Sequence, residues 1–301
     1  MAPVSIKKWL GFGVSNTLNN SVVHFFPNSH SISAPYSANC ALSIFAGGME
    51  RRQVLLEGGR FGNPDGVRLE DAFPSIKADF SGLYAVEVEI STTQSRLDLS
   101  SSGCVIEIIS QGLISRYLPC QVNYGVEGSI LSNTTPAPLA ASGQAISVLA
   151  AKDSFLSTSL VVINPTPDDY SVKVVMERDN AEASIIQHSE FKSNTIDEIM
   201  FRDSTFEDSS LQECSWGLMR ARPLQVLVSK GTALSGLPAV EGSSLSIKSR
   251  PLMVQPNEPE VRCFAVYRDS QSRRIVSVVS LQGRALPRAA PEQTATGAQQ
   301  I

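Results

Sequence analysis

Residues 159–176 read SLVVINPTPDDYSVKVVM, an apolar run that the polar segment NPTPDD interrupts before the apolar residues resume. The first run is apolar at successive positions and rich in β-branched residues, a pattern typical of a strand covered on both faces. In YSVKV, after the interruption, apolar and polar residues alternate with the period of a half-buried strand. Proline cannot donate to a β-ladder, and Asn and Asp favour turns. The stretch therefore predicts two antiparallel strands joined by a hairpin connection at 164–169.

The alternating pattern recurs along the chain, whereas helical periodicity is almost absent. It is clearest in Tyr84–Ile90 (YAVEVEI) and in Leu224–Val228 (LQVLV). We expect these strands to bury one face, and each buried Val or Ile then stabilises the fold by roughly 1.5–3 kcal/mol. The residues expected on inner faces are Val86, Val88, Ile90, Val172, Val174, Val226 and Val228.

A weaker copy of the opening pattern lies earlier in the chain. Leu42–Phe45 precedes Leu160–Ile163 by 118 positions, and Leu69–Asp71 precedes Ile196–Glu198 by 127. The growing offset indicates insertions in the second copy around 178–213. Several ordered matches in equivalent strand or turn contexts predict a tandem duplication.

The expected fold is all-β, with two tandem antiparallel β-sandwich domains of immunoglobulin-like or jelly-roll-like type. Each copy offers several short strands separated by turn signals, as sandwiches do. We expect domain 1, with an N-terminal segment, over 1–127 and domain 2 over 128–285. The remaining residues, 286–301, are small, polar and rich in Pro, Ala and Gln, which predicts a disordered tail.

Composition limits the class of protein. The chain has 301 residues, 42% hydrophobic content and a net charge of −4, which favours buried cores and disfavours binding to nucleic acid. No apolar run approaches the ~18–20 residues of a transmembrane segment, and no signal peptide is recognisable. The five cysteines are odd in number and widely spaced, as expected of reduced cysteines in a cytoplasmic protein.

The order of motifs in the second copy resembles that of a known family. A strand ending in Asn164-Pro165 is followed by the alternating strand Ser171–Met176, a polar segment and the stretch Trp216–Val228. This order resembles small bacterial β-sandwich domains such as the sensory rhodopsin transducer family. The first copy departs from it, since Ala46-Gly47 replaces Asn164-Pro165. The resemblance implies a soluble oligomeric adaptor that associates with a larger, membrane-bound assembly, and it transfers no functional residue.

Motifs that carry chemistry are missing from the sequence. The three histidines form no His-x-His or His-Glu-x-x-His pattern, and Gly-x-Ser-x-Gly does not occur. The glycine-rich stretch 58–66 lacks the Gly-Lys-Ser/Thr of a P-loop and is better explained as a hairpin loop that presents Arg60 and Phe61. Cys120 and Cys263 lie in apolar strands, where a thiol acts as a core residue. We therefore expect no catalytic residue, metal site or cofactor, and a protein that is not an enzyme.

Charge is unevenly distributed along the second half. Twelve Asp or Glu residues lie between 165 and 214 against four Lys or Arg, whereas arginines dominate 261–301. The two regions are either scattered loop charge or complementary patches that meet head-to-tail between subunits. Trp9, beside Lys7-Lys8, is equally compatible with a surface anchor and with a core position.

These observations favour a structural or adaptor protein that associates with itself or with protein partners, including a membrane complex. The alternative is a carbohydrate- or ligand-binding module, although only 7% of the chain is aromatic. An enzyme with carboxylate chemistry is a third hypothesis, which no motif supports. The residues expected at an interface are Trp9, Arg60, Phe61, Asp168, Asp169, Arg273 and Arg274.

Overall fold

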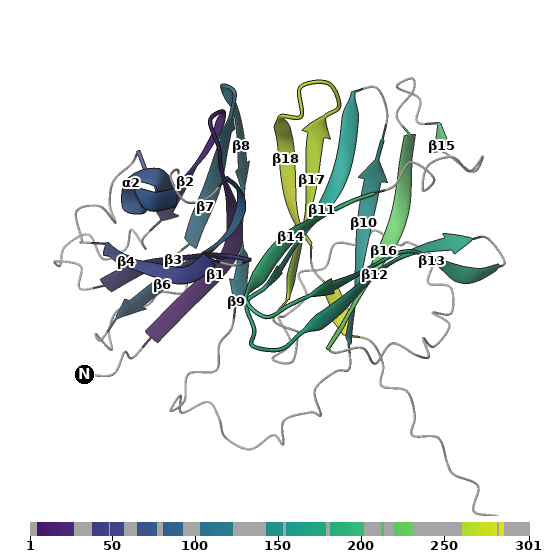
Figure 1. Ribbon diagram of the computed structural model, residues 1–301, viewed down its shortest axis with the longest axis horizontal. Coiled ribbons are helices and arrows are strands. Elements are labelled where there is room, and N and C mark those ends of the chain that lie inside the picture. The colour runs from purple at the N-terminus through teal and green to yellow at the C-terminus, as the bar shows by residue number, and fades with distance from the viewer. Residues whose placement is uncertain are drawn as a thin grey trace, which may run out of the picture.

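The part of the protein that the computed structural model describes is built almost entirely of antiparallel β-sheet (Figure 1). The single helix among the described residues is α2 (Leu69–Ala72), a short turn of helix. The structure describes residues 5–26, 38–47, 49–56, 65–76, 81–92, 103–122, 143–152, 155–178, 181–201, 212–213, 220–230, 261–281 and 283–285. The all-β expectation is confirmed.

The first half of the chain forms two sheets. Sheet A has the order β4-β3-β6-β1-β9, and sheet B has the order β5-β2-β7-β8. Their strands are β1 (Ser5–Ser15), β2 (Asn19–Phe26), β3 (Ala38–Ala46), β4 (Met49–Leu56), β5 (Val67–Arg68), β6 (Gly82–Thr92), β7 (Gly103–Ser110), β8 (Leu113–Tyr117) and β9 (Cys120–Val122).

The second half forms two further sheets. Sheet C has the order β13-β12-β16-β10-β19, with β15 paired to β16, and sheet D has the order β14-β11-β17-β18. Their strands are β10 (Gly143–Ala151), β11 (Leu156–Asn164), β12 (Tyr170–Arg178), β13 (Ala181–Phe191), β14 (Thr195–Met200), β15 (Gln212–Glu213), β16 (Arg220–Lys230), β17 (Arg262–Asp269), β18 (Ile275–Leu281) and β19 (Gly283–Ala285).

The strand order of sheets A and B recurs in sheets C and D. The strands β1–β5 correspond in order to β10–β14, and the strands β6–β9 correspond in order to β16–β19. With this matching, the strand order of sheet A is that of sheet C, and the order of sheet B is that of sheet D. The short strand β15 is the only described strand without a counterpart.

Apolar side chains from alternate positions fill the space between the sheets. In β6, Val86, Val88 and Ile90 are fully buried, and the expected valines of β12 and β16 are buried as well. This confirms the seven inner-face residues predicted from the alternation. The result follows from the pleat, which sends every second side chain to the same face of a sheet.

Sheet D is apolar on both of its faces. On β11, Leu160 and Val162 belong to the core shared with sheet C. The residues between and after them, Val161 and Ile163, belong instead to the core that contains the side chains of sheets A and B. The successive apolar residues of the opening stretch are therefore explained by a strand with a hydrophobic core on each side, as predicted.

An aromatic contact joins the two halves of the chain. Phe264 on β17 lies edge-on to Phe12 on β1, with ring centroids 5.5 Å apart, and to Tyr117 on β8 at 5.6 Å. All three rings are buried. Edge-to-face pairs of this kind stabilise a core beyond the area that they bury.

Tyr117 also secures the backbone of β1. Its hydroxyl donates to the carbonyl of Phe12 and accepts from the N–H of the same residue, both at 2.6 Å. The hydroxyl reaches this position because Gly11 has no side chain. A Cβ there would lie 2.8 Å from the Tyr117 oxygen and 2.5 Å from the Ile106 side chain. Glycine is thus required at this close approach.

The hairpin predicted at 164–169 is wrong, although a turn does occur there. β11 pairs with β14 and β17 in sheet D, whereas β12 pairs with β13 and β16 in sheet C, so the turn crosses between sheets. The buried Asn164 holds the crossing, since its amide donates to the carbonyls of Asp168 and Lys192 at 2.7 and 2.9 Å. Local turn chemistry does not distinguish a hairpin from such a crossing.

The offset of 118 used to align the two copies is also wrong. It places Leu42–Phe45 of β3 on Leu160–Ile163 of β11, whereas the strand order matches β3 to β12 and β2 to β11. The error arises because neighbouring apolar strands look alike in sequence. The later match of Leu69–Asp71 to Ile196–Glu198 is displaced as well, because Leu69–Asp71 lie in α2 and Ile196–Glu198 lie in β14. The pairings with β2 and β11 place Val67 of β5 on Ile199 instead.

The contact between the halves predicts the effect of shortening Phe264. We expect Phe264→Ala to lower the free energy of unfolding by about 3–5 kcal/mol, because a buried ring leaves a cavity on both sides of the contact. Denaturant unfolding followed by circular dichroism measures the change. Phe155→Ala is the matched control, since Phe155 is 64% exposed, and its cost is expected to stay within about 0.5 kcal/mol. Equal losses for the two variants would contradict this account.

Candidate functional site

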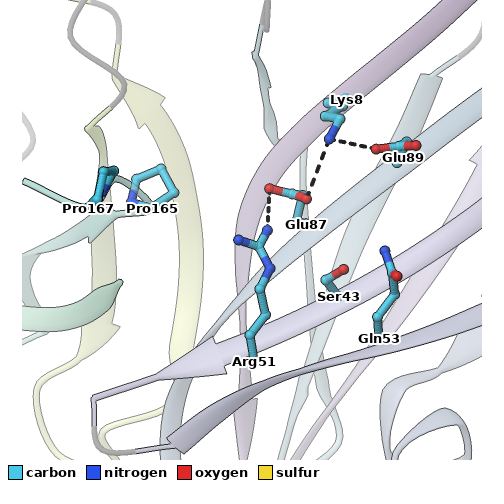
Figure 2. Close-up of a pocket in the computed structure, with 8 residues that line it drawn as sticks. All are labelled: Lys8, Ser43, Arg51, Gln53, Glu87, Glu89, Pro165 and Pro167. Carbon is cyan, nitrogen blue, oxygen red and sulfur yellow. Dashed lines mark ion pairs between the residues drawn. The ribbon is translucent and has the colours of Figure 1, made fainter. Parts of the chain in front are cut away.

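A polar cleft of about 540 Å³ lies where sheet A meets the β11–β12 turn (Figure 2). One wall is the outer face of sheet A, and the other carries Pro165 and Pro167 from the turn. The residues of the sheet A wall are Lys8 of β1, Ser43 of β3, Arg51 and Gln53 of β4, and Glu87 and Glu89 of β6.

Register brings these polar side chains onto one face. Lys8 is opposite Glu89, and Glu87 is opposite Ser43, which in turn is opposite Gln53. Directly opposed residues in antiparallel strands point to the same side of the sheet. The charged positions in YAVEVEI thus form the cleft, while the valines between them fill the sandwich.

Glu87 is the centre of an ion-pair network. Its carboxylate lies 2.6 Å from Arg51 Nη2 and 4.0 Å from Lys8 Nζ, and Lys8 also pairs with Glu89 at 2.6 Å (Figure 2). Only 7% of the Glu87 side chain is exposed, against 41% for Arg51. Arg51 is steadied by the Phe45 ring, whose centroid is 5.3 Å from the guanidinium carbon.

The cleft is open and polar, and its lining differs from the mostly apolar lining of typical ligand pockets. Its volume lies within the ~300–1,000 Å³ typical of ligand pockets. Arginine and lysine supply N–H donors, glutamates supply acceptors, and the serine and the glutamine supply both. Among the described residues, no group of three or more His, Cys, Asp or Glu is placed to hold a metal ion.

Of the expected interface positions, one lies in the core and two lie outside the described residues. Trp9 is only 6% exposed and belongs to the core of the first half, so the surface-anchor reading is corrected in favour of the core position. The alternation of β1 explains this, since Trp9 and Gly11 share the inner face that packs on sheet B. Arg60 and Phe61 lie outside the described residues.

The acidic and arginine pairs lie at opposite ends of sheet D. Asp168 and Asp169 follow the Asn164 end of β11, whereas Arg273 and Arg274 lie beside its Leu156 end. They therefore do not meet within one chain. A hydrogen bond from Lys192 lowers the pKa of Asp169, and Arg274 donates to Gln111 of the first half at 2.9 Å.

One contact between the acidic and the basic region does form within the chain. Arg268 donates to Glu198 Oε1 and Oε2 at 3.0 and 3.1 Å, and Ser159 donates to the same carboxylate. This pair lies on the face of sheet D that looks toward sheet A. It leaves Arg268 and Glu198 less available for a contact between subunits.

The cysteines of the described chain behave as core residues. Burial, reinforced by the nearby Glu89 carboxylate, raises the pKa of Cys40 to about 12. Burial likewise raises the pKa of Cys104 and of Cys263 far above the ordinary thiol value. A thiol with a raised pKa is a poor nucleophile at neutral pH. Cys263 thus has the structural role predicted for it, while Cys120 is half-buried.

The cleft residues were not predicted from the sequence. A charge at every second position of a strand normally indicates a solvated face, and nothing local marks Glu87 as buried. The available signal was weak: Lys8 and Arg51 are cations on strands that could pair with those glutamates. Deciding this requires the strand order, which places β1, β3 and β4 around β6.

Comparison of the chain with protein-family models, with curated proteins and with solved structures found no match. Over the part of the chain that the structure describes, no helix has the length and apolar character needed to cross a membrane.

The network around Glu87 predicts a measurable contribution to stability. We expect Glu87→Ala to cost about 1–3 kcal/mol, because Arg51 and Lys8 lose the carboxylate that compensates their charge. Denaturant unfolding measures the loss, and Glu50→Ala on the same sheet serves as control because Glu50 is exposed. A Glu87→Ala variant as stable as the wild type would show that the network makes no net contribution.

Proposed function

We propose that the protein is a non-enzymatic structural or adaptor protein, made of two tandem β-sandwich units that arose by duplication. The units correspond to residues 1–127 and 128–285. In this proposal the chain acts as a rigid subunit of a homo-oligomer or of a larger complex in the cytoplasm. The repeated strand order supports the duplication.

The observation that carries the proposal is the apolar contact between the units. Val161, Ile163, Phe264 and Val266 of sheet D lie in the same core as the side chains of sheets A and B. Units that share a core cannot move independently without exposing it to water. A rigid two-unit body suits a spacer or adaptor, which must hold its contact surfaces at fixed separation.

A crosslinking experiment tests the proposal. The full chain carries an affinity tag in its native cell, is crosslinked, purified and identified together with its partners by mass spectrometry. We expect a protein partner or a second copy in stoichiometric amount, with the tag alone as control. A chain recovered as a free monomer, combined with turnover of a small-molecule substrate, would overturn the proposal.

The cleft favours a second candidate, a carbohydrate-binding module. The charged residues of the cleft are paired with one another, as in Lys8–Glu89 and Arg51–Glu87. Ser43 and Gln53 are uncharged hydrogen-bonding residues on the same wall, and the two prolines make the opposite wall apolar. Hydroxyl groups of a saccharide both donate and accept hydrogen bonds, and such a surface offers partners for both. Glu87 and Arg51 would fix the orientation of the bound sugar.

A glycan array followed by calorimetry tests this second candidate. We expect a bound saccharide whose affinity falls about tenfold in Gln53→Ala, the equivalent of one lost hydrogen bond. Glu50→Ala, on the same strand but outside the cleft, is expected to bind as the wild type does. If no saccharide binds, or if Gln53→Ala has no effect, the cleft is not a sugar site.

A further inference from the structure

Sheets B and D correspond residue by residue, as their pairings show. Val23 of β2 is opposite Ile106 of β7, which is opposite Tyr117 of β8. In sheet D the corresponding row is Leu160 of β11, Ala265 of β17 and Val279 of β18. The offsets are 137 for β2 and β11, 159 for β7 and β17, and 162 for β8 and β18. The offsets hold along the paired stretches up to the register shift between Tyr267 and Arg268, with Cys104 matching Cys263.

This correspondence gives each residue on the docked face of sheet D a counterpart on sheet B. The valine cluster of sheet D (Val161, Val266 and Val278) lies in the core shared with the first unit and is at most 6% exposed. Subtracting the three offsets gives positions 24, 107 and 116. These are His24, Glu107 and Arg116, here called the charge cluster.

The charge cluster is a connected polar group on the outer face of sheet B. Arg116 Nε donates to Glu107 Oε2 at 2.6 Å, and His24 Nε2 lies 3.4 Å from the same oxygen. The Glu107 side chain is 8% exposed, because Arg116 and His24 cover it, while 64% of the Arg116 side chain faces solvent. Two exposed apolar residues flank Arg116 along the chain, Ile114 of β8 and Leu118 just after β8.

The contact between the units is head-to-tail, so its geometry can in principle be repeated. Sheet D of the second unit lies on sheet A of the first, which are different sheets of the repeated pattern. Sheet B of the first unit is the counterpart of sheet D, and sheet C of the second unit is the counterpart of sheet A. Among the described residues, the edge strand β8 of sheet B runs beside β18, and no other sheet lies across the outer face of sheet B. Contacts of this type generate rings or open filaments when nothing stops them.

We propose that His24, Glu107 and Arg116 close the outer face of sheet B to a second copy of this chain. This inference rests on the duplication in the proposed function. Docking in the mode of sheet D would strip water from Arg116 and place a charged group where the interface requires a valine. The cost of removing water from the Arg116–Glu107 ion pair makes such a contact unfavourable. A partner of the adaptor must therefore differ in chemistry from the chain itself on this face.

Replacing the charge cluster by the residues of its counterpart tests the inference. We expect the variant H24V/E107V/R116V to self-associate, with an apparent Kd for association at least about 100-fold lower than that of the wild type. Sedimentation velocity over a hundredfold range of concentration measures it, with circular dichroism to verify folding. A folded variant that sediments as the wild type does at every concentration would overturn the inference.

Two further variants keep the test decisive. E107Q/R116M retains the approximate shape of both side chains without their charge. It replaces the triple variant if that variant fails to fold, and we expect it also to self-associate more strongly than the wild type. The control D169V/K192V replaces an exposed ion pair remote from sheet B, whose side chains are 50% and 68% exposed. It is expected to remain like the wild type, and equal association of this control would show a general effect of added valines and overturn the inference. None of these measurements requires the partner, so their outcome is independent of the crosslinking experiment.

Discussion

The contact between sheets A and D is the constraint on which the rest of the structure depends. Phe264 of sheet D lies edge-on to both Phe12 and Tyr117 and so enters the core of the first half. Because the pleat sends alternate side chains to opposite faces, sheet D can serve two cores only where successive residues of β11 and β17 are apolar. Leu160–Ile163 and the stretch 263–266 satisfy this condition, and they fix how the two units are joined.

The polar cleft is a consequence of that contact. Sheet D and its turn cover the apolar part of the outer face of sheet A, and the cleft opens where this face becomes charged. Glu87 is buried there because Arg51 and Lys8 surround it. An ion-pair network at the margin of an apolar contact also fixes its register, since a slip of one residue would move Glu87 into the core.

The two units use equivalent faces in opposite ways. Sheet D presents Val161 and Val266 to its neighbour, whereas sheet B presents His24 and Glu107 at the corresponding positions. A duplicated chain with two identical faces would carry its own template for further association. In the proposed duplication, differentiating one face while retaining the backbone pairing would limit further association, as the proposed adaptor role requires.

The sequence by itself determined the strands, their buried positions and the doubly covered strand at 159–164, because alternation is a local consequence of the pleat. Only the tertiary structure decided which strands are partners, since pairing depends on residues far apart in the chain. The turn at Asn164 therefore crosses between sheets instead of closing a hairpin. For the same reason β3 of the first copy corresponds to β12, and not to β11 as the sequence comparison predicted. The burial of Trp9 and of Glu87 was decided in the same way, by the sheet that covers each of them. Alternation of apolar and polar residues indicates that one face of a strand is buried, but it does not indicate which element packs against either face.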